Sequence, residues 1–335
     1  MDWQNQKEQL ISYAQNREDI LLARALKPWE HSGFWIDIGA GHPRFDSVTA
    51  LFSNFGWRGI NVEPLDEEFD LLTQERSRDI NIHTAVGLHE GTATLYAGPP
   101  ENRGMSTLVE FQGEMLLETG FTKVHVPVIT LQSIVDEHVS EAVDFLKVDV
   151  EGFEYEVLSS VNLAALRPRI IVVEATLPGT TIDSSGPWES LVIDAGYQLV
   201  MFDGLNRYYC LVDGDPAIQK SLSIPVNVLD NFVEYRTQIE IGAGLARINR
   251  DYREALDDLA ETKRQLHRMQ QDLITSQRKC ASALESLVPF EQKIDDIESR
   301  LGYQIYSNMA HRIANHPWMF TSIKKILSWF SSGSD

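Results

Sequence analysis

The stretch that decides the fold is WIDIGAGHP, residues 35–43, an apolar strand that runs into an acidic residue and a tight glycine turn. Glycine lets the backbone turn sharply and approach a ligand closely. In open α/β sheets, ligands bind at the carboxyl ends of the strands, which is where this turn would lie. Residues 35–43 therefore predict a strand and a ligand-binding loop of an α/β domain.

The sequence around this stretch predicts the rest of the domain. Short apolar, β-branched runs alternate with helical patterns from Ser12 to about Val212, which indicates a mostly parallel sheet. Several runs are apolar nearly throughout, as expected where helices cover both faces. Two runs that flank a polar break predict an antiparallel hairpin at one edge of the sheet. The expected strands are 33–38, 59–63, 81–86, 143–148 and 169–174, with 197–202 and 207–212 as the hairpin.

The composition excludes several classes of protein and of partner. The 335 residues are 43% hydrophobic and 23% charged, which is typical of a globular protein and excludes a disordered or collagen-like chain. The net charge of -20 repels phosphate backbones, so nucleic acid is not expected as a partner. Two distant cysteines form no CxxC pair, so neither a zinc site nor a disulfide framework is expected. Without a signal sequence or a long apolar run, we expect a cytoplasmic protein with at most peripheral membrane contact.

A different pattern follows the α/β domain. Residues 213–235 are rich in turn residues and predict a linker with a short strand or turn. From Leu245 as position a, apolar residues recur at a 3-4 spacing as far as Leu301, with charged and amide side chains between them. We expect a coiled coil over residues 236–301, and a long helix folded back on its own domain is the alternative.

The predicted coil has two special positions and a distinct tail. Pro289 should kink or break the helix, because proline removes a helix hydrogen bond. Cys280 takes a core position, where a partner chain would bring its twin within reach. A homo-oligomer is therefore expected, although the core residues do not determine how many chains it contains. In the tail of residues 302–335, the stretch 316–332 predicts a basic amphipathic helix that binds a membrane surface or another protein.

The strand after the glycine turn points to a cofactor. It ends in Glu63, about 24 residues after Gly39, where a carboxylate can accept both ribose hydroxyls of an adenosine-containing cofactor. Such a cofactor is a nicotinamide dinucleotide or S-adenosylmethionine (SAM). A dinucleotide fold has a third glycine where this chain has His42. Asp37 suits the cationic end of SAM and would repel a pyrophosphate, so the turn favours SAM.

A second acidic cluster is expected at the same edge. The stretch FLKVDVEGFE, residues 145–154, places Lys147, Asp149 and Glu151 on one side of a strand, and the next strand ends in Glu174. A carboxylate here could take a proton from a substrate hydroxyl. Asp149, Glu151 and Glu174 could instead hold a divalent cation such as Mg²⁺. In a plainer interpretation, Glu151 and Glu154 only stabilise the start of a helix.

Taken in order, five stretches resemble the FkbM-type SAM-dependent methyltransferases over roughly residues 10–212. They are 12–19, 37–41, 56–64, 85–87 and 146–154. The resemblance implies a class I methyltransferase fold, Rossmann-like, for the domain of residues 1–212. It also implies transfer of a methyl group from SAM to an oxygen, commonly a sugar hydroxyl. The residues that it assigns to the cofactor pocket are Gln15, Asp37, Gly39, Gly41, Glu63, Ala85 and Val86.

The resemblance also assigns roles within that pocket. Glu63 would hold the ribose, Ala85 and Val86 would border the adenine, and the N-terminal motif with Gln15 would close over the site as a lid. Many family members have asparagine at the position of Gly41 and a glycine nearby, so His42 is expected to be a local feature of the pocket wall. The stretch 104–108 is a candidate acceptor loop.

The sequence thus predicts a SAM-dependent O-methyltransferase that acts on a sugar hydroxyl in surface polysaccharide or glycan biosynthesis. Asp149, Glu151 and Glu174 are its candidate catalytic or metal-binding residues. A carbohydrate or glycolipid acceptor is the expected substrate, and the tail could contact a glycosyltransferase. The alternatives are a nicotinamide-dependent sugar-nucleotide oxidoreductase, and a coiled-coil scaffold with a degenerate domain. Buried acidic strand ends are costly without a ligand or partner, which weighs against the scaffold.

Overall fold

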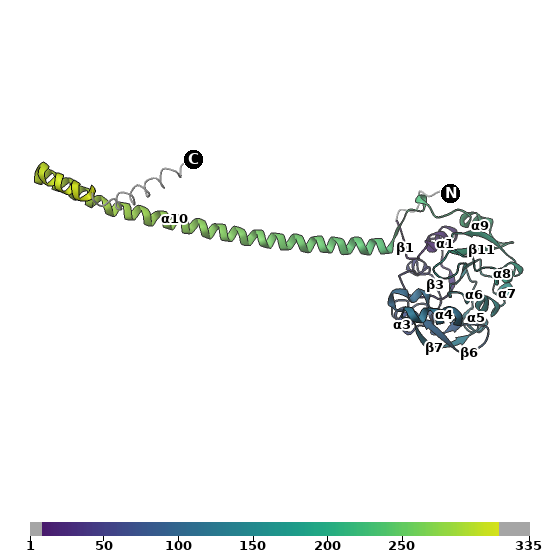
Figure 1. Cartoon of the computed structure of the whole chain (residues 1–335). Helices are drawn as coiled ribbons and strands as arrows, with labels where there is room; N and C mark the ends of the chain where they lie inside the picture. The colour runs from purple at the N-terminus through teal and green to yellow at the C-terminus, as the bar shows by residue number, and fades with distance from the viewer. Residues whose placement is uncertain (1–8, 315–335) are drawn as a thin grey trace. The chain divides into compact units, whose positions relative to one another are not determined.

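The computed structural model describes residues 9–314 (Figure 1). The chain divides into two compact units, Met1–Gly244 and Leu245–Asp335. The first unit holds the α/β domain, and the second holds most of one long helix. Within residues 9–314, no helix combines the length and the apolar character needed to cross a bilayer.

A seven-stranded sheet forms the centre of the first unit, in the order β10-β11-β9-β8-β2-β3-β4. The pairs from β9 to β4 are parallel, and β10 and β11 form an antiparallel hairpin at one edge. The expected fold class, a mostly parallel sheet closed by an edge hairpin, is confirmed. The strands are β2 Phe34–Ile38, β3 Arg58–Val62, β4 Ile80–Ile82, β8 Phe145–Val148, β9 Ile170–Glu174, β10 Tyr197–Phe202 and β11 Asn206–Leu211.

Helices bury both faces of this sheet, which is why its central strands are apolar throughout. On one face, Trp35 and Phe145 pack with residues of α1, α2 and α9. On the other face, Ile36 and Leu146 pack with residues of α5, α6, α7 and α8. Neighbouring residues of one strand thus enter different clusters, as a period of two requires. The helices are α1 Glu18–Leu26, α2 Ala50–Asn54, α5 Leu131–His138, α6 Glu154–Ser159, α7 Leu163–Leu166, α8 Glu189–Asp194 and α9 Pro216–Leu222, and α3, Asp66–Glu75, lies beside β4.

A second, three-stranded sheet has the order β5-β7-β6. Its strands are β5 Ala85–Val86, β6 Gly91–Ala97 and β7 Thr122–Ile129. The expected single strand 81–86 is therefore wrong: the chain turns at Thr84, whose N–H bonds to the carbonyl of Ile82, and then changes sheets. β7 alternates exposed with buried residues, as a strand with one buried face does, and its Pro127 lies at an exposed position.

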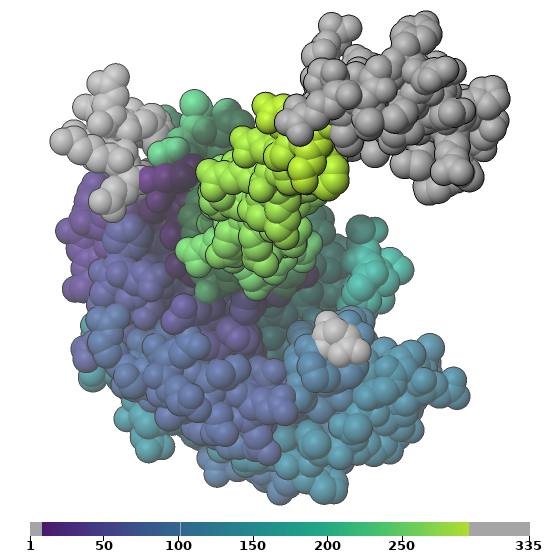
Figure 2. All heavy atoms as spheres, turned by 90° about the vertical axis from the view of Figure 1, so that its left-hand side faces the viewer, coloured from purple at the N-terminus to yellow at the C-terminus, as the bar shows by residue number. Residues whose placement is uncertain are grey.

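Between β6 and β7 the chain forms a helical insertion. It consists of η2 Pro100–Met105, α4 Glu110–Leu116 and η3 Leu117–Thr119. In Figure 2 this part of the chain, in blue to teal, belongs to the lower half of the α/β domain. The expected acceptor loop, residues 104–108, lies inside the insertion.

The two ends of the first unit are paired with each other. β1, Leu10–Ser12, runs parallel to β12, Phe232–Glu234. The segment 213–235, expected as a linker with a short strand or turn, contains α9, the short helix η4 Val228–Asp230 and β12. Ile218 and Leu222 of α9 are buried against the sheet. Much of this segment is therefore folded onto the domain.

One long helix, α10, runs from Tyr235 to Ala314. It continues through Pro289, so of the kink or break expected there, the break does not occur. In the single chain, the side chains at the heptad core positions from Leu245 to Ile294 that are large and apolar are exposed, and so is Cys280. The expected amphipathic helix at 316–332 lies outside the described residues.

Candidate active site

The glycine turn after β2 is fixed by the backbone. The N–H groups of Gly39 and Ala40 both donate to the carbonyl of Val62, at 3.0 and 3.1 Å. Gly39 has φ +78°, and a Cβ there would lie 1.9 Å from the carbonyl oxygen of Asp149. Gly41 has φ +59°, and a Cβ there would meet no atom of the described residues within 4 Å. Only glycine fits at Gly39, whereas the space beside Gly41 is open to a ligand.

Glu63 follows β3 and closes the turn from the other side. Its carboxylate accepts hydrogen bonds from the N–H groups of Gly41 and Leu65, each at 2.9 Å. Burial raises its pKa to about 7, against the lowering effect of these two bonds. Because each carboxylate oxygen has two lone pairs, both oxygens can still accept one further hydrogen bond. Glu63 is thus held ready for a donor such as a ribose hydroxyl.

The residues expected at the adenine lie on the small sheet. Ala85 and Val86 are buried, and Ala85 shares an apolar cluster with Leu65, which follows Glu63. The N–H of Glu63 bonds to the carbonyl of Ile82, three residues before Ala85. The structure therefore brings these two residues to the apolar side of the Glu63 turn.

Lys147 joins the glycine turn to the acidic cluster. Its ammonium lies 3.4 Å from Asp37 Oδ1 and 3.2 Å from Asp149 Oδ2, and it donates to the carbonyl of Gly39 at 3.2 Å. Burial by itself lowers the pKa of Lys147, but the two carboxylates raise it overall. Asp37, expected to face the cofactor, is only 1% exposed and pairs with Lys147 and Thr49. Asp37 therefore lies beneath the glycine turn and supports it through Lys147.

Asp149, Glu151 and Glu174 converge as the sequence predicts. One carboxylate oxygen of each lies within 4.8 Å of the others. Glu174 is only 7% exposed. Its Oε2 and the Oε2 of Glu151 are buried and have no hydrogen-bond partner among residues 9–314. Burial, and next the charge of Asp149, raise the pKa of both glutamates. Three neighbouring carboxylates of this kind can bind a proton or a cation.

The two glutamates that could start a helix, Glu151 and Glu154, have different roles. Glu151 lies outside α6 and has φ +52°, a left-handed conformation that is uncommon for glutamate. Glu154 begins α6 and accepts a hydrogen bond from the N–H of Gly152 at 3.0 Å. The helix-start interpretation therefore fits Glu154, whereas Glu151 faces Asp149 and Glu174.

The N-terminal motif anchors its own turn to the sheet. Asp19 is buried and accepts hydrogen bonds from the hydroxyl of Ser12 and the N–H of Tyr13. Glu18 accepts from the side chain of Asn206, which is the β11 residue paired with Glu174. The segment between them thus passes the same strand end as the acidic cluster. Gln15, expected to bind the cofactor, is exposed within this segment.

The insertion after β6 reaches the cluster as well. The hydroxyl of Thr107 donates to the carbonyl of Glu151 at 2.8 Å, and a Cβ on Gly152 would lie 3.2 Å from the side-chain amide of Gln112. Sequence reasoning singled out residues 104–108 as a loop but missed these two contacts. No local signal marks them, because Thr107 and Glu151 are 44 residues apart.

His42 has a structural role in the turn. Its Nδ1 faces the N–H groups of Arg44 and Phe45 at 3.0 and 3.1 Å, so Nδ1 accepts and any ring proton is on Nε2. Burial lowers its pKa, in keeping with a neutral ring. His42 therefore holds the loop after Gly41 in shape.

Comparison with known proteins identifies a family for part of this chain. A solved structure of methyltransferase FkbM from Methylobacillus flagellatus KT is similar at 16% identity and a TM-score of 0.32, over 53% of this chain. The similarity spans only 43% of that protein's chain, and at this score it supports no argument. No curated protein matches the chain. The family model described as methyltransferase FkbM domain matches residues 37–199, from Asp37 on β2 to Leu199 on β10. Residues 37–199 of this chain are therefore a methyltransferase FkbM domain.

Proposed function

We propose that this domain transfers the methyl group of SAM to a hydroxyl oxygen of a carbohydrate, as a step in surface polysaccharide or glycan biosynthesis. The observation that carries the proposal is the convergence of Asp149, Glu151 and Glu174 within 4.8 Å. Lys147 links this cluster to the glycine turn of a methyltransferase domain. A site of this kind unites a cofactor loop with groups that can take a proton from a hydroxyl.

The residues at the sheet edge fit SAM. Glu63 keeps lone pairs for ribose hydroxyls, and the space beside Gly41 is open. The cationic sulfonium and amino group of SAM match a cluster in which Glu151 and Glu174 each have a carboxylate oxygen without a partner in the described part of the chain. When bound, SAM would supply the methyl group, and its sulfonium would be the leaving group that keeps the electron pair of the carbon–sulfur bond.

The residues of the chain supply alignment and a proton acceptor. Asp149 is partly exposed, and Lys147 holds its Oδ2 at 3.2 Å. We assign Asp149 as the group that takes the acceptor's hydroxyl proton. Holding the acceptor oxygen in line with the methyl group provides the rest of the acceleration, since it removes the entropic cost of a chance encounter.

A divalent cation such as Mg²⁺ is the second component that we propose. Oxygen ligands are what Mg²⁺ prefers. Glu174, which is only 7% exposed, contributes a buried oxygen that has no hydrogen-bond partner among the described residues. A cation between the three carboxylates would offset their mutual repulsion and lower the pKa of a bound hydroxyl.

Titration calorimetry of the full chain tests the cofactor. S-adenosylhomocysteine and SAM should bind saturably and NADH should not. Glu63→Gln should weaken this binding about 10- to 100-fold, because a hydrogen bond to a charged group is lost. Glu30→Gln, on the exposed Glu30, should leave it unchanged. Binding of NADH alone would support the oxidoreductase alternative, and a folded chain that binds none of the ligands would support the scaffold.

Mn²⁺ is a suitable probe of the cation site, followed by the relaxation of water protons. Glu174→Gln should weaken Mn²⁺ binding at least about tenfold, since a charged ligand is lost. Glu137→Gln, at an exposed position of α5, is the matched control. Equal Mn²⁺ affinity in the Glu174 variant and the parent would leave the cluster with a proton-accepting role alone.

A further inference from the structure

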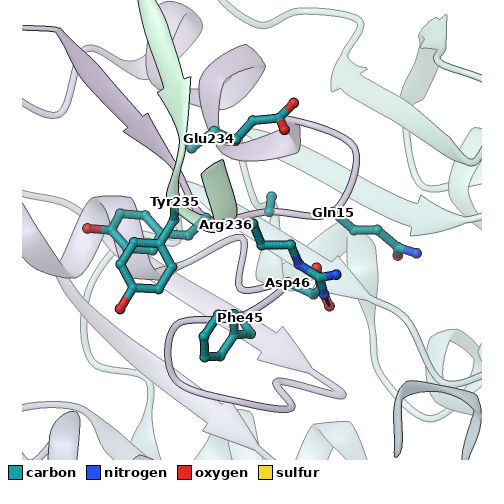
Figure 3. A pocket seen from close by; sticks show the side chains of 9 residues that line it. Gln15, Phe45, Asp46, Glu234, Tyr235 and Arg236 are labelled. Atoms are coloured by element: carbon teal, nitrogen blue, oxygen red, sulfur yellow. Dashed lines mark hydrogen bonds and ion pairs between the residues drawn. The ribbon is translucent and has the colours of Figure 1, made fainter. Parts of the chain in front are cut away.

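A cavity of about 160 Å³ lies beside the glycine turn. Three parts of the chain line it: residues 12–15 at the end of β1, residues 45–46 after the glycine turn, and residues 234–236 where β12 meets α10 (Figure 3). Cavities for drug-sized ligands begin at about 300 Å³. This cavity is therefore suited to one ring and not to an extended molecule.

Aromatic rings form one wall of this cavity. The ring centroids of Tyr13 and Tyr235 are 4.7 Å apart, and those of Phe45 and Tyr235 are 5.4 Å apart. The hydroxyl of Tyr13 accepts a hydrogen bond from the side chain of Asn54 at 3.1 Å. Figure 3 shows Phe45 and Tyr235 together on one side of the cavity. Packed rings of this kind offer a rigid, flat apolar surface.

Polar groups form the opposite wall. Arg236 pairs with Asp46 at 2.7 Å, and Glu234 pairs with Arg17 at 2.5 Å. Figure 3 shows Gln15 beside the Arg236–Asp46 pair, and no hydrogen bond of the Gln15 side chain occurs among the described residues. The wall thus offers an amide, carboxylates and a guanidinium, with little net charge. Such a set suits hydroxyl groups, which donate and accept, better than it suits a phosphate.

The cavity shares its walls with the candidate active site. Phe45 and Asp46 follow Gly41 closely in the chain. His42 holds the loop from Gly41 to Phe45 in shape. Gln15 is three residues before Glu18, whose carboxylate bonds to Asn206 opposite Glu174. Asp46 also has φ +56°, and left-handed residues cluster at functional sites. A molecule in this cavity therefore lies against the same two segments that border the cofactor turn and the acidic cluster.

We propose that this cavity binds one pyranose ring of the acceptor, an inference that rests on the proposed function. The C–H face of the ring stacks on the aromatic wall, and its hydroxyls bond to Gln15, Asp46 and Arg236. Seven of the nine lining residues, those at 12–15 and 234–236, lie outside the residues 37–199 that match the family model. The cavity is thus a determinant of acceptor choice that belongs to this chain's own flanking segments.

Saturation-transfer NMR with the full chain and bound S-adenosylhomocysteine tests this inference. The probes are neutral methyl pyranosides of gluco, manno, galacto and 6-deoxy configuration, with glucose 6-phosphate as the charged control. At least one neutral glycoside should give a saturable signal. Gln15→Ala and Tyr235→Leu should each weaken it at least about threefold, since each removes one wall contact. Phe55→Leu, at an exposed ring outside the cavity, is the matched control.

The outcomes separate this inference from the proposed function. If S-adenosylhomocysteine binds and no glycoside does, the ring subsite is wrong and the methyltransferase proposal stands. The subsite is also wrong if Gln15→Ala weakens S-adenosylhomocysteine and leaves the glycoside signal unchanged, since the cavity would then belong to the cofactor. Gln15→Ala removes an exposed side chain, so it keeps the test valid if Tyr235→Leu fails to fold.

Discussion

Gly39 shows how a single residue can decide whether the cofactor turn forms. A Cβ there would overlap the carbonyl oxygen of Asp149, at 1.9 Å, and φ is already +78°. We expect Gly39→Ala to abolish S-adenosylhomocysteine binding and to lower the free energy of unfolding by about 3 kcal/mol or more, from strain plus a backbone clash. Urea unfolding and titration calorimetry measure the two effects.

Gly204→Ala is the control for backbone strain alone. Gly204 has φ +101° in the hairpin turn, and a Cβ there would have no neighbour within 4 Å among residues 9–314. This variant should lose about 1 kcal/mol of stability and bind the ligand normally. Equal ligand affinity in both variants would contradict the role assigned to Gly39.

Glu18 gives the protein a pH-dependent stability. Burial raises its pKa to about 7, from 4.5 as the ordinary value. Between these values the native state binds a proton that the unfolded state releases, so this contribution is present below pH 4.5 and is lost as the pH rises through 7. The loss is of the order of 3 kcal/mol.

Glu18→Gln should therefore flatten the stability profile. Its free energy of unfolding should fall less than that of the parent between about pH 5 and pH 8, because the amide does not titrate. Urea unfolding at a series of pH values measures the difference. Glu118→Gln, at an exposed position, should follow the parent. Parallel curves for Glu18→Gln and the parent would refute the assignment.

At the scale of elements, a buried ion pair holds the two ends of the first unit together. Arg24 of α1 donates to both carboxylate oxygens of Asp230 in η4, at 3.0 Å, and both side chains are nearly inaccessible. The next residues form β12, which pairs with β1. Arg24 and Asp230 are 206 residues apart, so no local sequence pattern predicts the contact.

Arg24→Met should loosen this pairing of β1 and β12. It leaves Asp230 buried without its partner, which costs about 3–5 kcal/mol. Amide exchange in β1 and β12 should become faster than exchange in β8, which lies at the centre of the sheet. Lys27→Met, which breaks the exposed pair with Glu30, is the control and should change stability by less than about 1 kcal/mol. Unchanged exchange in β1 would show that the ion pair does not hold the strands.

At the scale of the whole molecule, α10 carries an apolar stripe that a second copy of the chain can cover. Leu266 and Leu273 are 56% and 59% exposed in the single chain, and both take core positions of the heptad pattern. In a parallel pair of helices, Asp258 at position g would face Lys263 at position e of the partner, a favourable match. We expect a parallel homo-oligomer.

Two measurements check this expectation. Leu266→Glu combined with Leu273→Glu should convert the oligomer to a monomer in light scattering, whereas Ile274→Glu, on the outer face, should not. Mild oxidation should link Cys280 to its twin, because parallel core positions bring the two Cα atoms to within about 7 Å. A monomeric parent would overturn the expectation, and an oligomer that does not cross-link would overturn the parallel register.

The sequence by itself determined the central sheet, its edge hairpin, the glycine turn at Gly39 and the helix after Tyr235. These features follow from signals within a few residues of each other: apolar runs, glycine geometry and a 3-4 spacing. It also placed Asp149, Glu151 and Glu174 together, because the ends of neighbouring parallel strands meet at one edge.

Only the tertiary structure decided the rest. It split the expected strand 81–86 between two sheets, paired Asp37 with Lys147 beneath the turn, and brought Thr107 to the carbonyl of Glu151. It also assembled the ring-sized cavity from residues 12–15, 45–46 and 234–236. These contacts join segments that are far apart in the chain. They are set by the burial and hydrogen bonding that the whole domain requires, and no local pattern encodes them.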